Sequence, residues 1–151
     1  MRSKLLNKED GRRTIAVIMD TGDEVLSTMK AVAARENIRA AQITAIGALS
    51  DVVLLYFDWQ KKSYCKIPVR EQVEVASLIG DIALDPKGKP AVHIHLVVGK
   101  SDGTAMAGHL GEAHVRPTLE VIVQEAPSYL QKTHDEASGL ALIDIGERAH
   151  A

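Results

Sequence analysis

The stretch Ala-Val-His-Ile-His-Leu-Val-Val-Gly-Lys-Ser-Asp-Gly-Thr-Ala-Met-Ala-Gly-His-Leu, residues 91–110, decides how this chain folds. Two apolar runs flank Ser101-Asp102-Gly103, and a short connection that ends in glycine is typical of a β-hairpin. If Gly103 takes the left-handed position of a three-residue loop, Lys100 pairs with Thr104. The stretch therefore predicts two antiparallel strands and fixes which of their residues lie opposite one another.

The three histidines of this hairpin are predicted to converge. Alternate side chains of a strand share a face, so His93 and His95 point the same way. Counting outward from the loop puts His109 opposite His95, where β-carbons lie about 4.5 to 5.5 Å apart. A slip of one residue would turn His109 to the other face, so the register is the decisive expectation.

Three imidazoles on one face favour a metal site. Neutral imidazole is the commonest metal ligand in proteins, and three of them with one open position is the arrangement of catalytic zinc. The alternative is that His93 and His95 form only a polar strand face. The remaining histidines are interpreted as solvent-exposed or packing residues: His114, His134 and His150. His114 lies five residues after His109, and this odd spacing turns it to the other face of a regular strand.

Composition bounds the class of protein. At 151 residues, with 46% hydrophobic and 25% charged residues, the chain is expected to form one domain, 1–151. A net charge of −2 and an aromatic content of 3% argue against a broad basic surface or base-stacking platforms for nucleic acid.

The single cysteine, Cys65, excludes an intramolecular disulfide and is expected to be buried or half-buried. No signal peptide or membrane span is evident, so cytoplasmic residence is expected.

The pattern along the chain indicates an α+β fold with one main helix near the amino terminus. Residues 14–19 read as a strand, and Thr21 with Glu24 resembles a capping box for a helix whose apolar face reaches Ala33. Residues 127–138 are expected to be a short helix or a loop. The other strands are predicted at 42–46, 52–57, 63–69, 73–84, 91–98, 104–110, 118–124 and 140–145. So many strands in a short chain favour a strongly curved, largely antiparallel sheet or a partial barrel.

Four of the five aromatic residues, Tyr56, Phe57, Trp59 and Tyr64, lie in one predicted hairpin. They are interpreted as core or subunit-contact residues rather than as a ligand cage.

Four motifs in a fixed order resemble the PPC domain, the plants-and-prokaryotes conserved domain, in its stand-alone prokaryotic form. They are Ile-Thr-Ala-Ile-Gly-Ala-Leu-Ser (43–50), Val-Glu-Val-Ala-Ser-Leu-Ile-Gly-Asp-Ile (73–82), Val-His-Ile-His-Leu (92–96) and Gly-His-Leu (108–110). The likeness runs from about residue 13 to residue 145. It implies an α+β fold, assembly as a homotrimer and a metal, with zinc the expected ion, bound by three histidines: His93, His95 and His109.

The resemblance also brings a DNA-binding label, which transfers poorly. Plant members carry a separate AT-hook that enters the minor groove, and Gly11-Arg12-Arg13 is not such a segment. The family usually has glycine where this chain has Ala107, which is tolerated unless a positive backbone angle is needed there.

Three hypotheses about function remain after this reading. The first is a metal site that holds water or a small-molecule ligand, with Glu74 and Glu112 as weak candidates for a general base if it is catalytic. The second is a transcription-regulatory DNA-binding protein, and the third is an oligomerisation or partner-binding module that a metal stabilises. No nucleophile motif, phosphate-binding loop or dinucleotide fingerprint assigns a reaction or a substrate.

Overall fold

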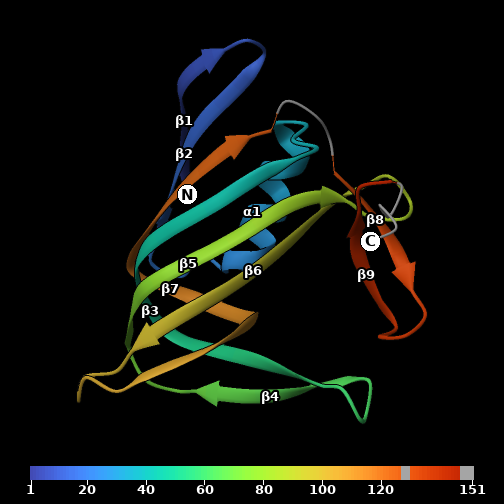
Figure 1. The fold of residues 1–151 in the computed structure, drawn as a ribbon. Coiled ribbons are helices and arrows are strands. Elements are labelled where there is room, and N and C mark those ends of the chain that lie inside the picture. Colours follow the sequence, from blue (N-terminus) through green and yellow to red (C-terminus); the bar gives the residue numbers. More distant parts are fainter. Residues whose placement is uncertain (127–129, 147–151) are drawn as a thin grey trace.

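The computed structural model describes residues 1–126 and 130–146, and within them the chain forms one helix and nine strands (Figure 1). In chain order they are β1 (Arg2–Glu9), β2 (Arg12–Asp20), α1 (Val25–Arg35), β3 (Ala41–Asp58), β4 (Ser63–Val69), β5 (Val73–Leu84), β6 (Pro90–Gly99), β7 (Ala105–Glu125), β8 (Gln131–Asp135) and β9 (Leu140–Asp144).

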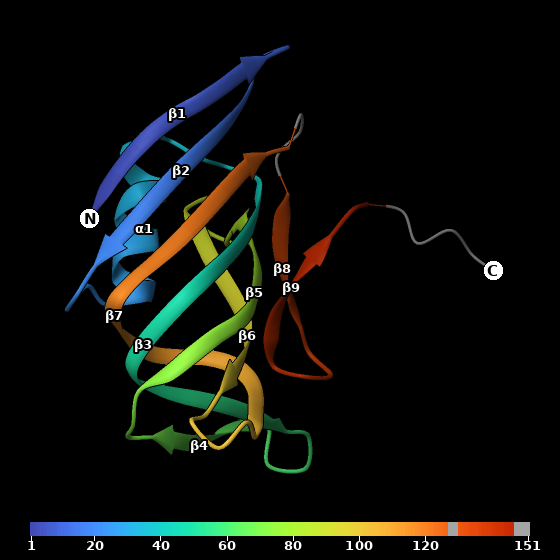
Figure 2. The same cartoon turned by 90° about the vertical axis from the view of Figure 1, so that its left-hand side faces the viewer.

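The strands form one sheet that curls on itself. The main path runs β1-β2-β7-β3-β5-β8-β9, and β6 joins β5 to the first part of β7, so that β3, β5, β6 and β7 close a ring. Of the pairings described, the contact between Leu84 of β5 and Gln131 of β8 is parallel and the others are antiparallel. Helix α1 packs against the sheet, and β8 and β9 form a hairpin that meets the rest of the sheet at the end of β5 (Figures 1 and 2). The α+β class and the strongly curved, largely antiparallel sheet are thus confirmed.

Strands β3 and β7 are longer than predicted. Strand β3 joins two segments that are predicted as separate strands, 42–46 and 52–57. Strand β7 likewise joins the predicted strands 104–110 and 118–124. Each is continuous because β3 and β7 pair along most of their length across bulges. One bulge lies at Gly47, whose φ is +149° and whose added β-carbon would lie 2.3 Å from the Thr118 carbonyl oxygen. A glycine is therefore required where the two long strands approach each other.

The N-cap of the helix lies three residues later than the capping-box prediction has it. Glu24 is itself the N-cap, because its carboxylate accepts hydrogen bonds from the backbone N–H groups of Leu26 and Ser27. The Thr21 hydroxyl instead donates to the Pro117 carbonyl oxygen, so its predicted capping role is wrong. The helix ends before Asn37, which adopts a left-handed φ of 52°.

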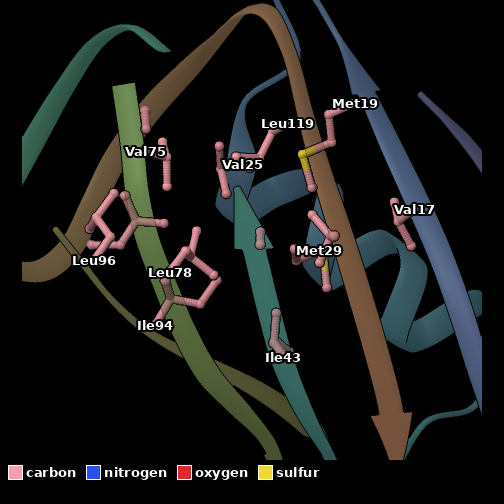
Figure 3. Packing of buried hydrophobic residues seen from close by; sticks show 14 of the residues in the cluster. Val17, Met19, Val25, Met29, Ile43, Val75, Leu78, Ile94, Leu96 and Leu119 are labelled. Atoms are coloured by element: carbon pink, nitrogen blue, oxygen red, sulfur yellow. The ribbon is translucent and has the colours of Figure 1, made fainter. Parts of the chain in front are cut away.

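The core lies between α1 and the concave face of the sheet (Figure 3). Met29 and Val25 of the helix lie near Met19, Val17 and Leu119, and none of these five residues is more than 2% exposed (Figure 3). Among the described residues no helix is long and apolar enough to cross a membrane.

Two elements were not predicted. Strand β1 is exposed along its whole length and carries several charges, so it has no hydrophobic pattern, and its sequence signal is the Asp10-Gly11 turn that joins it to β2. Strand β8 falls in 127–138, where a helix or loop was expected, and residues 127–129 lie outside the described residues.

Strand β4 corrects two burial predictions. Cys65 is exposed, because β4 pairs only with β3 and runs beyond the core, so burial along that face reaches only Ile67 and Val69. The aromatic side chains of the same hairpin are not core residues either: Tyr56, Trp59 and Tyr64 are exposed. Whether they contact another subunit stays a prediction.

Candidate metal centre

The histidine register is as predicted. The Lys100 backbone N–H donates to the Thr104 carbonyl oxygen at 2.8 Å, and Gly103 has a left-handed φ of 82°. His95 pairs directly with His109 across β6 and β7. Because the loop has the predicted length, all three imidazoles lie on one face of the hairpin.

The three rings converge closely enough to share one cation. Their centroids are 5.0 Å apart for His93 and His95, 5.0 Å for His93 and His109, and 5.2 Å for His95 and His109. One nitrogen from each ring lies within 4.8 Å of the others, and His93 Nε2 is 3.2 Å from His95 Nε2. Imidazole nitrogens that lie this close to one another can bind one divalent ion together.

A carboxylate fixes the orientation of His93. Asp81 lies opposite His93 on the neighbouring strand β5, and its Oδ2 is 3.1 Å from His93 Nδ1. When Nδ1–H donates to this carboxylate, Nε2 is left with a free lone pair that faces the other two histidines. Burial raises the pKa of Asp81, but the hydrogen bond with His93 and the charge of Lys132 outweigh it and hold that pKa below its usual range.

Lys132 is the charged partner of Asp81. It comes from β8, is 8% exposed, and places Nζ 3.4 Å from Asp81 Oδ1. The hairpin of β8 and β9 is thereby tied to the strand that carries Asp81. Gln131 adds a second tie, because its side-chain amide donates to the Asp85 carbonyl oxygen at 2.6 Å.

The electrostatics keep two of the imidazoles neutral. Burial, followed by the nearby His93 and His95, lowers the pKa of His109 to about 4. Burial and the nearby His93 also lower the pKa of His95. Neutral imidazoles can bind a cation at neutral pH without first losing a proton, which favours metal binding.

An unpartnered atom supports the same interpretation. His109 Nδ1 is buried and has no hydrogen-bond partner among the described residues. Buried polar atoms are nearly always paired, so this one calls for an explanation. Coordination of a metal through this nitrogen would account for it. Three nitrogen donors suit zinc, which binds imidazole in sites that keep a position open. The residues present therefore fit a divalent metal.

The histidines line a cavity of ≈ 630 Å³. Tyr64 of β4 stands at its wall, with its ring centroid 5.1 Å from that of His109. Asp81 and Lys132 also line it, and strand β9 supplies an aliphatic side that includes Leu142 and Ile143. The sequence reasoning missed Asp81, Lys132 and Tyr64 as site residues, because each reaches the histidines through the pairing of strands distant in sequence.

The two glutamates suggested as bases do not join this cavity. Glu74 is exposed on β5, opposite Gly99, and Glu112 is exposed on β7 with Oε1 3.9 Å from His114 Nε2. Neither is among the residues that line the cavity.

The remaining histidines stay outside the cluster. His114 lies apart, with Nδ1 2.9 Å from Asp51 Oδ1, a hydrogen bond that raises its pKa. His134 is exposed on β8, and His150 lies outside the described residues.

Fold and site together define a small α+β protein with a three-histidine cluster on a hairpin of a curved sheet. Residues 6–127 match the Plants and Prokaryotes Conserved (PCC) domain, and the chain therefore belongs to this family. This confirms the resemblance drawn from the four motifs. The match includes all three histidines and Asp81, and it ends before the hairpin of β8 and β9.

Solved structures agree with the family assignment. A plant- and prokaryote-conserved (PPC) protein of Pyrococcus horikoshii is 33% identical, with a TM-score of 0.83 over 90% of this chain and 94% of its own. A protein of Archaeoglobus fulgidus described as metal-containing is 30% identical, with a TM-score of 0.80 over 95% and 98%. A Bacteroides thetaiotaomicron protein, described provisionally as DNA-binding, is 27% identical, with a TM-score of 0.81 over 91% and 94%. Comparison with curated proteins found no significant match.

Proposed function

We propose that this protein binds one zinc ion per chain through His93, His95 and His109 and presents it to a small molecule. The observation that carries the proposal is the convergence of one nitrogen from each ring within 4.8 Å. The metal-containing description of the Archaeoglobus fulgidus relative supports it. Three protein ligands leave a coordination position for water or a ligand, as in catalytic rather than structural zinc sites.

The chain's own residues have distinct roles around the ion. Zinc bound here would supply a Lewis acid and lower the pKa of a bound water. Asp81 holds His93 in the tautomer that offers Nε2, and Lys132 partly neutralises Asp81. Since Glu74 and Glu112 lie outside the cavity, we assign no general base and no named reaction to this site.

Metal analysis of protein purified without an affinity tag tests the proposal. We expect close to one equivalent of divalent metal per chain after incubation with zinc, and loss of it in His93→Ala and His109→Ala. His134→Ala, which removes an exposed histidine outside the cavity, is the control and should retain the metal. Uptake below roughly a tenth of an equivalent in the parent protein would show that the site does not exist.

We also propose that the protein assembles as a homotrimer. Three large apolar side chains on neighbouring strands of the ring are left exposed by the described part of the chain: Ile46, Ile79 and Val97, which are 62%, 58% and 37% exposed. Contiguous exposed apolar side chains are typical of subunit contacts. Sedimentation equilibrium should give three times the chain mass, and a monomer at micromolar concentration would contradict it.

DNA binding is the second candidate function, and the description of the Bacteroides thetaiotaomicron relative is what favours it. A binding assay at several salt concentrations tests it. Real phosphate contacts would give an affinity that falls steeply as salt rises. No binding at low salt would remove this candidate.

A further inference from the structure

We propose that the cavity beside the three histidines binds a short aliphatic monocarboxylate, with the carboxylate between the metal and Lys132 and the hydrocarbon chain against β9. This inference rests on the proposed metal site and names the class of ligand that the site takes. The residues that support the inference come from the β8–β9 hairpin, which supplies Lys132 and an aliphatic wall to the cavity. This hairpin lies beyond the residues matched by the family domain.

The charges in the cavity call for an anion. Bound zinc would bring two positive charges to the cavity, and Lys132 adds a third. The described lining sets two carboxylates, Asp81 and Asp85, against these three positive charges. The Asp85 Oδ1 also accepts the backbone N–H groups of Lys87 and Lys89 at 2.8 Å each. The metal-loaded cavity therefore keeps an excess of positive charge, which a bound anion would neutralise.

Lys132 has donors to spare. Its ammonium group carries three N–H bonds, and its one ionic partner among the described residues is Asp81 Oδ1 at 3.4 Å. It is 8% exposed, so water reaches it poorly, and it lines the same cavity as the histidines. A carboxylate at the metal would satisfy a donor that the protein itself leaves unused.

The chemistry of the wall favours a carboxylate over a phosphate. Phosphate is commonly held by several donors, such as arginines or a helix N-terminus. The described lining holds no arginine, serine or threonine, and it brings Asp81 and Asp85 close to any dianion. A monoanion with one charged end suits the single ammonium group of the described lining, which has N–H bonds left beyond its ion pair with Asp81.

Apart from Tyr64, the uncharged part of the described wall beside the histidines is aliphatic. Leu140, Ala141, Leu142 and Ile143 line the side formed by β9, with Ala91 and Val92 of β6 nearby. Leu142 is 46% exposed and Ile143 is 40% exposed, so both have apolar surface left to cover. A hydrocarbon chain that leaves the metal toward β9 would cover this surface, and a volume of ≈ 630 Å³ admits several methylenes.

The test uses cobalt in place of zinc, because the visible spectrum of a cobalt site changes when a ligand enters its coordination sphere. Cobalt-loaded protein is titrated with acetate, butanoate and hexanoate, with butanamide and inorganic phosphate as matched comparisons. We expect a saturable spectral change with the carboxylates and an affinity that rises up to about fourfold per buried methylene. Butanamide and phosphate should bind at least tenfold more weakly than butanoate.

Variants separate the two ends of the ligand. Lys132→Met should weaken butanoate about tenfold or more while cobalt still binds, and Lys87→Met, an exposed lysine of the β5–β6 turn, should change neither. Leu142→Ser should flatten the dependence on chain length. Equal affinity for acetate and hexanoate, preference for phosphate, or no spectral change at millimolar carboxylate would each overturn this inference while cobalt binding keeps the metal site. If cobalt itself does not bind, the metal site falls and the inference falls with it.

Discussion

The stability of the metal-free protein should depend on the protonation of His109. In the folded chain, burial and then the nearby His93 and His95 lower the pKa of this imidazole to about 4, whereas its ordinary value is 6.5. Between these two values the unfolded chain binds more protons than the folded one. The contribution is therefore fully present above about pH 6.5 and is lost as the pH falls toward 4.

The size of the effect follows from the gap between the two pKa values. A gap from 6.5 to about 4 corresponds to an upper limit of about 3 to 4 kcal/mol in the free energy of unfolding. Because the ring is only partly buried, solvent screening reduces the expected value to about 2 kcal/mol. His109→Gln keeps a polar side chain of similar size without a group that titrates in this range.

Urea unfolding followed by circular dichroism, at pH 7 and pH 4.5 with a chelator and a fixed protein concentration, measures the effect. The parent should lose about 2 kcal/mol more than His109→Gln between the two pH values. His134→Gln, which removes an exposed imidazole, is the control for other consequences of losing a histidine. Equal losses in the parent and His109→Gln would refute the reasoning about the buried neutral ring.

Three further predictions follow from single contacts. Asp81→Asn should weaken zinc binding about 10- to 100-fold in a competition titration, because His93 loses its orienting carboxylate. Asp85→Asn is the control, and an unchanged zinc affinity in Asp81→Asn would contradict the role of Asp81. Gly80→Ala should destabilise the protein by about 2 kcal/mol or more in urea unfolding, because the new β-carbon would lie 2.3 Å from the His93 carbonyl oxygen. The β-carbon of Gly99→Ala meets no atom within 4 Å, so this control should cost less than about 1 kcal/mol. Equal costs would disprove the close approach of β6 to Gly80. Glu125→Gln should cost about 2 kcal/mol at pH 7, because Arg13 donates two 2.7 Å hydrogen bonds to that carboxylate and thereby lowers its pKa. The difference from the parent should shrink as the pH falls below about 4.5, and Glu120→Gln, exposed on the same strand, should show none of it.

The hairpin that carries the histidines could be predicted because its register depends on local chemistry. Loop length and Gly103 set the pairing of Lys100 with Thr104, and strand alternation then places His95 opposite His109. The same kind of signal located the helix, since its apolar residues repeat with helical spacing.

Other parts of the fold depend on contacts between distant residues and could not be predicted. Strand β1 has no apolar face and exists because β2 offers it a partner through the Asp10-Gly11 turn. The long strands β3 and β7 continue through bulges that the sequence suggests as breaks.

The residues around the histidines could not be predicted either, because contacts between distant parts of the chain bring them together. Asp81 reaches His93 only because β5 pairs with β6, and Lys132 comes from a polar stretch with no regular pattern. Glu74 and Glu112 were suggested by proximity in sequence to motifs, whereas the cavity is assembled from β4, β5, β6, β7, β8 and β9.

Anomalous X-ray diffraction from crystals of tag-free protein loaded with zinc tests most directly that the three histidines hold one metal ion. We expect a single strong peak per chain, about 2.0 to 2.1 Å from one nitrogen each of His93, His95 and His109. His93 should coordinate through Nε2, because Asp81 occupies Nδ1. A peak held by other residues, or no peak in crystals grown with excess zinc, would contradict the account.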